Sequence, residues 1–363
     1  MAWELCRRSQ ARSHQAAIRW STRIIPTFLL GVIGFACWAT TKTICIDFFI
    51  SRHKYGGAIA LLVLHYIFLI LMLVCYARTL QTVAYNPGVV PVEPKIRLES
   101  FYTRDVYTCR SDGLPIWCST CQNWKPDRAH HSGEIQRCVT KMDHYCPWAG
   151  GMIGETSFKF FIQFATYTAC YCAVCLSAGA YVTSRLAREG ASVSVPAIVL
   201  IALGGFFGLF TFILAVRSHD FALSNTTNIE ELSLGSKATT LAIRIPLDQV
   251  PNPGNSAKAI DYTTITFPLT DDNFDGNQFI YDNRNTSANR PAEHKFAIVN
   301  TEVGDNPWDL GSRYRNWTSV MGDRGPVDWL LPLRLSPCCA HSGAYPFGPV
   351  VDRLRKKLEE EYE

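Results

Sequence analysis

The stretch AIALLVLHYIFLILMLVCYA, from Ala58 to Ala77, decides the fold of this 363-residue chain. Its twenty residues include no Asp, Glu, Lys or Arg. As an α-helix the stretch would be about 30 Å long, which matches the hydrocarbon layer of a bilayer. It therefore predicts a helix that spans a membrane.

Three further apolar blocks accompany it, from about Ile24 into the Cys45 region, from about Phe158 to Val182, and from Val195 to Val216. The block that begins at Phe158 is the weakest, because it is diluted by polar side chains (Gln163, Thr166, Thr168 and Ser177). Apolar residues make up 48% of the chain and concentrate in these blocks. We therefore expect an α-helical polytopic membrane protein with four transmembrane helices.

Basic residues predict how the chain is oriented. Residues 1–23 carry five arginines and residues 78–157 carry nine Lys and Arg, whereas the two short loops between paired spans carry two each. Basic residues favour the cytosolic side. We expect a cytosolic N-terminus (1–23), spans 1 and 2 (24–77), a cytosolic segment (78–157) with a cysteine-rich domain at about 116–157, spans 3 and 4 (158–216), and a cytosolic C-terminal region (217–363). The host membrane is an endomembrane or the plasma membrane.

Overall composition argues against two other classes of protein. The net charge of +4 is small and scattered, which excludes nucleic acid as the expected partner. Several of the fourteen cysteines lie inside apolar blocks, so they do not form the disulfide framework of a secreted protein. A reducing compartment is expected.

The region after Arg217 is polar. The part from Asn252 to Asn289 is rich in Asn, Asp, Thr and Gly and predicts a variable loop. Ordered structure is expected again from Asn306 to Gly311 and at Asn316-Trp317. The last residues, from Arg353 to Glu361, predict a short charged helix.

Four residues of the central segment have the types and spacing of zinc ligands. Cys118 and Cys121 form a Cys-x2-Cys pair, and His131 and Cys138 follow. With four protein ligands the site would be structural, and it would help to fold a segment too polar to build its own core. His130 and Cys109 are possible substitutes as ligands, and the alternative is that these are ordinary thiols and a surface histidine.

A second group of chemically active residues follows in the stretch Asp143-His144-Tyr145-Cys146. His144 is positioned to take the proton of Cys146, and Asp143 to orient the imidazole, which is the arrangement of an activated thiol. Taken alone this pattern is weak, since such residues are more often loop residues or metal ligands. Its place between a zinc module and a membrane span strengthens it.

Together these motifs resemble the DHHC cysteine-rich domain of the membrane S-acyltransferases, or palmitoyltransferases. The resemblance rests on Cys118-x2-Cys121, KPDRAHH (125–131), Cys138-Val139 and MDHYCPW (142–148). Asn86-Pro87-Gly88 after the second span resembles the Asp-Pro-Gly motif of the family, and Thr227-Asn228-Ile229-Glu230 its Thr-Thr-x-Glu motif. The stretch from Asn306 to Gly322 is similar to its conserved C-terminal element. The chain thus resembles a fungal member with an Asp-His-Tyr-Cys variant motif.

The resemblance implies a two-step transfer of palmitate from palmitoyl-CoA to protein cysteines. Cys146 would be acylated first, with His144 as the base and Asp143 orienting it. Lys125, Arg128 and Trp148 would bind acyl-CoA, the first two by facing its phosphates. The implied partners are the lipid bilayer and substrate proteins with cytosolic cysteines near the membrane.

The sequence departs from the family pattern in a coordinated way. Family members usually bind two zinc ions, and the ligands of one site are present. The other site would use positions 132, 135, 145 and 152, which here are Ser132, Ile135, Tyr145 and Met152. We therefore predict a single structural zinc, with apolar packing in place of the second ion. Asp143, His144 and Cys146 are unaffected by this loss.

Two other interpretations compete with the acyltransferase. One is a catalytically inactive, membrane-anchored zinc-binding scaffold, and the other is a RING-type ubiquitin ligase, which needs about twice as many ligands. Cys338-Cys339 is either an accessory acylation site near the membrane or an unmodified pair. The glycines of the fourth span, Gly204, Gly205 and Gly208, either leave room for an acyl chain or allow close helix packing.

Overall fold

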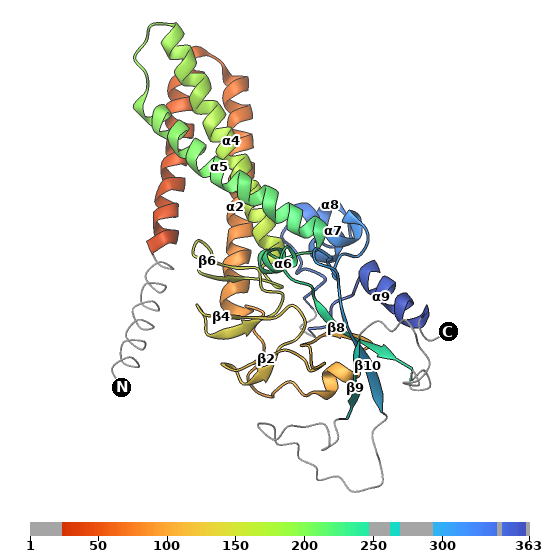
Figure 1. Ribbon diagram of the computed structural model, residues 1–363. Helices are drawn as coiled ribbons and strands as arrows, with labels where there is room; N and C mark the ends of the chain where they lie inside the picture. Colours follow the sequence, from red (N-terminus) through yellow and green to blue (C-terminus); the bar gives the residue numbers. More distant parts are fainter. Residues whose placement is uncertain (1–23, 247–261, 269–292, 340–342, 361–363) are drawn as a thin grey trace, which may run out of the picture.

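The computed structural model describes residues 24–246, 262–268, 293–339 and 343–360. In this part of the chain, four helices are long and apolar enough to cross a membrane: Ile24–Arg52, α2 (Tyr55–Tyr85), α4 (Phe158–Arg188) and α5 (Val195–Ser224). They form one bundle, and the cysteine-rich segment between α2 and α4 lies at one end of it (Figure 1). The four-span prediction is confirmed. The first span is π-helical over Ala39–Phe49.

The helices are longer than the apolar blocks of the sequence. A helix of 31 residues, such as α2, measures about 46 Å. The extra turns of α2 after Ala77 and of α5 after Val216 continue past the predicted membrane layer toward the cysteine-rich segment. These turns hold the polar part of the chain against the bundle.

The polar dilution of the third block has a structural reason. Half of the most apolar window of α4 is buried inside the protein, against 17–28% for the other three spans. A central helix can carry polar groups when they find partners. Thr166 and Thr168 donate to the carbonyl oxygens four residues earlier, and Gln163 donates to the carbonyl of Trp329 at 3.0 Å.

The cysteine-rich segment consists of short antiparallel hairpins. They pair β2 (Trp117–Cys118) with β3 (Asn123–Trp124), β4 (His130–Ser132) with β5 (Arg137–Val139), and β6 (His144–Cys146) with β7 (Gly151–Ile153). The β6–β7 hairpin lies directly on α2. A Cβ atom on Gly151 would come within 2.4 Å of Val83 Cγ1, so this close approach requires glycine.

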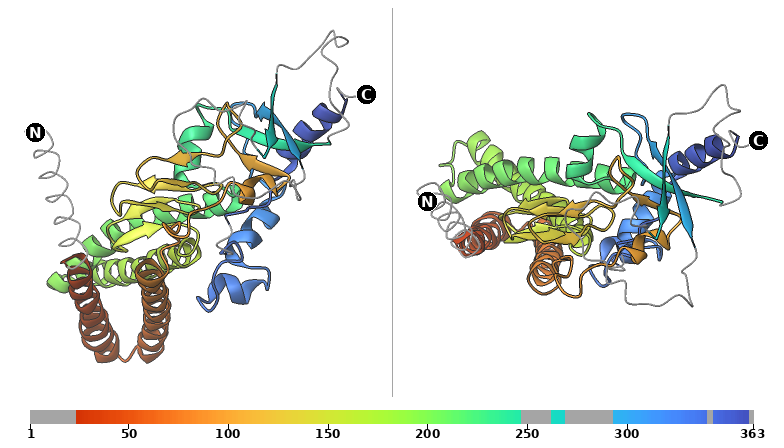
Figure 2. Two further views of the ribbon diagram at one scale, coloured as in Figure 1. Left: turned by 90° about the horizontal axis from the view of Figure 1, so that it is seen from below. Right: turned by 60° about the horizontal axis from the view of Figure 1, so that its bottom comes forward.

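The C-terminal region adds a sheet that the sequence analysis did not predict. Its order in the described residues is β1 (Val106–Thr108), β8 (Thr240–Ile245), β10 (His294–Asn300) and β9 (Thr263–Phe267), all antiparallel. The helix α3 (Glu99–Tyr102) contributes Phe101 to one face, and α9 (Pro349–Glu360) packs Val351 and Leu358 on the other. Both views of Figure 2 place this sheet and α9 far from the first two spans.

Two expectations about the C-terminal region can now be compared with the structure. The charged terminal helix exists and begins earlier than expected, at Pro349. The expectation of a loop from Asn252 to Asn289 is wrong for Thr263–Phe267, which forms the edge strand β9 beside β10. Apart from Tyr262 and Pro268, the rest of that stretch lies outside the described residues, as do residues 1–23.

Three short helices connect the sheet to the bundle: α6 (Asn228–Leu234), α7 (Arg313–Met321) and α8 (Pro326–Leu330). The α7 helix packs on α5, and its Asn316 is buried. The Asn316 side chain donates to the carbonyl of Leu223 at 2.9 Å and accepts from the backbone N–H of Leu310 at 2.9 Å. This explains why an asparagine is placed within the ordered C-terminal element.

Candidate active site and metal centre

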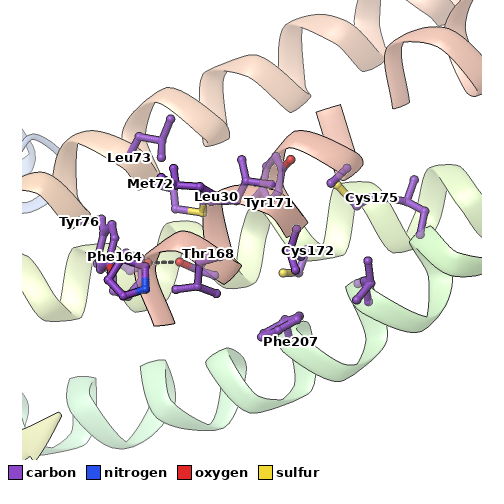
Figure 3. A pocket seen from close by; sticks show the side chains of 18 residues that line it. Leu30, Met72, Leu73, Tyr76, Phe164, Thr168, Tyr171, Cys172, Cys175 and Phe207 are labelled. Carbon is purple, nitrogen blue, oxygen red and sulfur yellow. Dashed lines mark hydrogen bonds between the residues drawn. The ribbon is translucent and has the colours of Figure 1, made fainter. Parts of the chain in front are cut away.

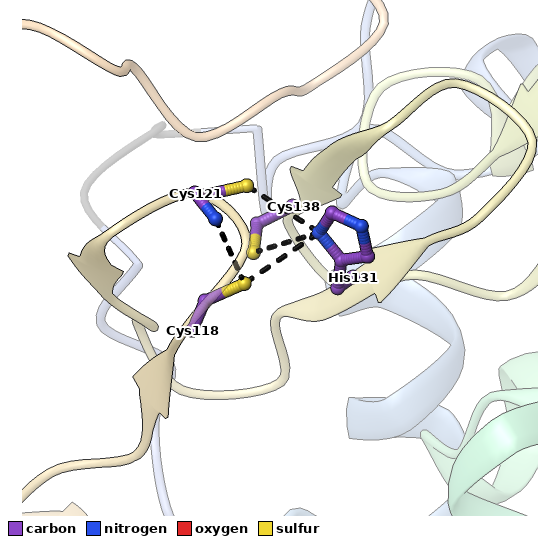
Figure 4. A group of neighbouring side chains, drawn as sticks. All are labelled: Cys118, Cys121, His131 and Cys138. Carbon is purple, nitrogen blue, oxygen red and sulfur yellow. Dashed lines mark hydrogen bonds between the residues drawn. The ribbon is translucent and has the colours of Figure 1, made fainter. Parts of the chain in front are cut away.

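Four metal-ligating side chains turn toward one another at the first two hairpins (Figure 4). His131 and Cys138 are direct partners across β4 and β5, and the β2–β3 turn brings Cys118 and Cys121 to the same place. All four donor atoms lie within 4.8 Å of one another. His131 Nδ1 is 3.5 Å from Cys118 Sγ and 3.4 Å from Cys121 Sγ.

These separations suit a metal ion. With a Zn–S distance of about 2.3 Å and a Zn–N distance of about 2.0 Å, tetrahedral geometry separates the donors by about 3.5 to 3.8 Å. Within the described residues this is the one such group of at least three His, Cys, Asp or Glu side chains, and neither His130 nor Cys109 belongs to it. Four protein donors leave no open position, which is typical of a structural site.

The four positions without metal ligands also come together. Tyr145 and Met152 are partners across β6 and β7, and they pack with Ile135 against Val139. The hydroxyl of Ser132, which is 1% exposed, lies 3.3 Å from Met152 Sδ. Side-chain packing thus joins the second and third hairpins at this place.

The strand β6 carries the two residues of the sequence motif that we predict to be reactive, His144 and Cys146. Alternation along a strand points His144 and Cys146 to one face and Tyr145 to the other. Tyr145 accordingly faces the apolar cluster just described, whereas Cys146 packs with Phe161 of α4 and Ala222 of α5. The His144 ring meets Phe161 edge to face, with centroids 5.2 Å apart. The thiol and the imidazole therefore face the helix bundle.

The electrostatics of His144 are set by Asp143. Burial alone lowers the pKa of His144, but the hydrogen bond with Asp143 and the interaction with Cys146 outweigh it and raise that pKa to about 9. Asp143 Oδ2 is 2.6 Å from His144 Nδ1. The imidazole is therefore protonated at neutral pH, and its Nε2 atom is left for proton exchange.

Asp143 is itself held by the start of α6. Its Oδ1 accepts the backbone N–H of Asn228 at 2.8 Å. The α6 helix begins with a capping box, in which Thr227 Oγ1 accepts the Glu230 N–H and the Glu230 carboxylate accepts the Thr227 N–H. The stretch Thr227–Glu230 therefore positions the carboxylate that orients His144.

Arg128 has a different role from the one expected. Its Nε and Nη2 atoms donate to the two Glu230 oxygens at 2.7 and 2.6 Å, and Nη1 donates to Asn225 Oδ1 at 3.0 Å. The side chain is buried and ion-paired, so it is not a free cation at the surface. The expectation that Arg128 faces CoA phosphates is wrong for this structure, because its guanidinium is bonded to Glu230 and joins the cysteine-rich segment to α6.

An apolar cavity lies between the four spans (Figure 3). It is partly open to the surroundings, and its outline contains about 760 Å³ of space not filled by protein atoms, with the space at the opening included. Side chains of all four spans line it, among them Leu30, Met72, Phe164, Cys172 and Phe207. Gly204 also lines it, and a Cβ there would lie 3.2 Å from the Cys172 carbonyl oxygen. Gly204 therefore both borders the cavity and allows α5 to pack closely on α4.

The cavity reaches the reactive strand through Tyr76. This residue lines the cavity, stacks on Phe164 with centroids 4.9 Å apart, and donates from its hydroxyl to the carbonyl of Trp148 at 2.8 Å. Phe164 also packs against the buried cluster that contains Cys146. Sequence reasoning missed Tyr76, because nothing in an apolar block marks which residue contacts the cytosolic domain.

The other two residues predicted to bind acyl-CoA, Trp148 and Lys125, lie outside the cavity lining. Trp148 directly follows the reactive strand, and its ring lies 6.2 Å from that of Phe210 on α5, between α2 and α5. Trp148 does not line the cavity itself. Lys125 is half-buried next to β3, and its backbone N–H donates to Ile116.

The structure combines four helices that can span a membrane, an apolar cavity between them and a buried thiol near a histidine, an arrangement that suits acyl transfer at a membrane. The family model described as DHHC palmitoyltransferase matches residues 113–234. The palmitoyltransferase pfa5 of Aspergillus fumigatus is 37% identical over 93% of this chain and 89% of its own length, and that of Emericella nidulans is 34% identical over 92% and 85%. Human palmitoyltransferase ZDHHC2 is 27% identical over 45% of this chain and 48% of its own length. The chain belongs to the DHHC palmitoyltransferase family and is a protein S-palmitoyltransferase.

Proposed function

We propose that Cys146 carries the palmitoyl group between palmitoyl-CoA and the acceptor protein. One observation carries this proposal: His144 and Cys146 face the bundle from one strand, beside the residues that line the apolar cavity. Exposing a C16 chain to water costs about 0.8 kcal/mol per CH2, so the acyl chain belongs in that cavity.

In the first step the Cys146 thiolate attacks the thioester carbonyl of palmitoyl-CoA. A new C–S bond forms on Cys146, the C–S bond to CoA breaks, and the CoA sulfur takes a proton from His144. In the second step the acceptor cysteine gives its proton to His144 and attacks the Cys146 thioester. A C–S bond forms on the acceptor, the C–S bond to Cys146 breaks, and Cys146 leaves as the thiolate. Asp143 keeps the imidazole in one orientation through both steps.

The chain binds a single structural zinc ion in this proposal. Cys118, Cys121, His131 and Cys138 would hold it, and the ion would fix the first two hairpins under the reactive strand. Packing of Tyr145 and Met152 takes the place of a second ion. The reactive stretch is therefore an Asp-His-Tyr-Cys variant that keeps its chemical groups.

The termini and the cysteine-rich domain lie in the cytosol in this proposal, as the distribution of Lys and Arg predicts. Palmitoyl-CoA and the acceptor cysteine then reach Cys146 from the same side. Because Cys146 lies at the bundle, the acceptors are proteins whose cytosolic cysteines lie close to the bilayer. Lys125 and Trp148 are the candidate contacts to acyl-CoA.

The test is labelling with an alkyne analogue of palmitoyl-CoA, followed by hydroxylamine, which cleaves thioesters. Wild-type protein is expected to take up label that hydroxylamine removes, and Cys146→Ser is expected to take up none. Cys109→Ser is a matched control, because Cys109 is a buried cysteine outside this site. Equal labelling of Cys146→Ser and wild type contradicts the proposal.

A further inference from the structure

The segment PVDWLLPLRL, from Pro326 to Leu335, follows α7 and presents apolar side chains at the protein surface. Its charged residues are Asp328 and Arg334. Its large aliphatic side chains are between 39% and 66% exposed: Val327, Leu330, Leu331, Leu333 and Leu335. An exposed apolar patch of this kind, outside the four spans, marks contact with another surface.

The segment is folded with its polar groups inward. Asp328 is buried, and its Oδ2 accepts the backbone N–H of Arg324 at 3.3 Å. The Trp329 indole donates to the carbonyl of Gly322 at 2.9 Å and packs against the buried cluster that contains Cys146. A buried aspartate beside exposed leucines is the reverse of the arrangement that water favours. The leucines therefore suit apolar surroundings.

A hydrogen bond to α4 fixes the depth of the segment along the bundle. Tyr167 of α4 donates from its hydroxyl to the carbonyl of Leu330 at 2.6 Å. Tyr76, close to the end of the apolar stretch of α2, stacks on Phe164 of α4. Tyr167 lies one helical turn beyond Phe164, about 4.5 Å farther from the cysteine-rich segment. The backbone at Leu330 is therefore level with the edge of the predicted membrane layer.

The neighbouring helices agree with this depth. Trp317 of α7 stacks on His219 of α5, just past the end of the apolar block at Val216, with centroids 5.4 Å apart. The α8 helix lies beside the end of the bundle, whereas the four-stranded sheet and α9 lie farther from the spans (Figure 1). The apolar segment therefore continues the surface that the spans present to lipid.

We propose that Pro326–Leu335 is an interfacial anchor, whose exposed aliphatic side chains insert into the membrane leaflet on the side of the cysteine-rich segment. Lipid is the partner that adjoins this surface, and its acyl chains take up the leucines. Asp328 is buried, so Arg334 supplies the exposed charge of the anchor, and it suits the phosphate of a lipid headgroup. The proposal does not depend on the role of Cys146.

The test uses the full chain in nanodiscs of phosphatidylcholine and phosphatidylserine. A phospholipid with a diazirine on its acyl chain, close to the carbonyl, is included, and peptide mass spectrometry locates the adducts after irradiation. Adducts are expected on the anchor leucines and on Phe212, an exposed residue of α5 that serves as the positive control. Adducts on Phe212 with none on the anchor overturn the proposal.

Leu232 of α6 is the matched negative control. It is 73% exposed, more than any residue of the anchor, but it lies past the end of α5. The proposal predicts no adduct on Leu232. Equal adducts on Leu232 and on the anchor overturn the proposal, because labelling would then follow exposure and not contact with the leaflet.

A double variant tests the side chains themselves. Leu333→Ser with Leu335→Ser should lower the adduct yield on the anchor about fivefold and leave that on Phe212 unchanged, because the binding of an interfacial segment scales with its apolar area. Leu333→Ile with Leu335→Ile should leave both yields unchanged. An unchanged anchor yield in the folded serine variant overturns the assignment of these side chains to the leaflet.

If the serine variant does not fold, hydroxyl-radical footprinting of the wild type in the same nanodiscs decides. Leu333 must then be oxidised about fivefold more slowly than Leu232, because the leaflet excludes water from it. Equal oxidation of Leu333 and Leu232 shows that the segment faces water, as a docking surface for a protein would, and refutes the anchor.

Discussion

Replacing Asp143 by Asn removes the negative charge that holds the proton on His144. The rise of the His144 pKa from 6.5 to about 9 corresponds to about 3 kcal/mol. Asp143 supplies part of this through a charge-assisted hydrogen bond, which is typically worth about 2 kcal/mol. An effect of that size slows acylation of Cys146 about 30-fold at pH 7.

The pH profile of the single-turnover acylation rate gives the sharper readout. A raised pKa means that His144 keeps its proton at neutral pH and loses it as the pH rises through about 9, so the wild-type rate should fall there. In Asp143→Asn this alkaline limb should move toward pH 6.5 to 7, because burial then lowers the histidine pKa with less opposition. Asp220→Asn, an exposed aspartate of α5, is the matched control.

Two results would refute this reasoning. One is a rate within threefold of wild type for folded Asp143→Asn, and the other is a reduced rate whose alkaline limb stays near pH 9. The second outcome would mean that Asp143 only supports α6, through its bond with the Asn228 N–H, and does not set the charge of His144.

Three further predictions concern stability, acylation and metal content. Glu230→Gln leaves the buried Arg128 without its counter-ion and should lower the free energy of unfolding by about 3 to 5 kcal/mol. The expected sign is a lower midpoint of thermal unfolding in detergent, and an unchanged midpoint refutes the prediction. Gly151→Ala should push the β6–β7 hairpin off α2 and reduce acylation of Cys146, and adding Val83→Ala to that variant should restore acylation. A Gly151→Ala variant as active as wild type excludes the close contact. Metal analysis should find one zinc per purified chain and none in Cys121→Ser, whereas two zincs per chain would show a second site.

The membrane part of the fold was predictable because hydropathy and helix length are local properties. Even the weak third span was found, and its polar residues proved to mark the most buried helix. The sequence does not indicate where a span continues beyond the apolar block. The turns of α2 after Ala77 therefore escaped prediction. The contact of Tyr76 with the Trp148 carbonyl escaped it too, because nothing inside an apolar block marks such a contact.

The C-terminal sheet escaped prediction for another reason. Its strands are short and far apart in the chain, since β1 lies before the cysteine-rich domain and β8, β9 and β10 lie after the bundle. The pairing of β1 with β8 joins residues more than a hundred positions apart, such as Val106 and Ile243. No periodicity within either segment reports that pairing.

The sequence predicted which residue types form the candidate site, but it did not predict the contacts between residues far apart in the chain. The four candidate metal ligands were predicted from their types and spacing, with His130 and Cys109 as possible substitutes. The structure brings Cys118, Cys121, His131 and Cys138 together. Arg128 illustrates the limit, because a basic residue in a polar segment favours a surface role until its partner Glu230, 102 residues later, is placed beside it. Long-range ion pairs leave no local signal.

A chase experiment tests directly whether palmitate passes through Cys146. Enzyme labelled with alkyne-palmitate is separated from all acyl-CoA and mixed with a cysteine peptide bound to a lipid vesicle. We expect label to leave Cys146 and to appear on the peptide thiol without fresh acyl-CoA, as fast as in steady-state turnover. Label that stays on Cys146 while the peptide is acylated only after acyl-CoA is added would contradict it.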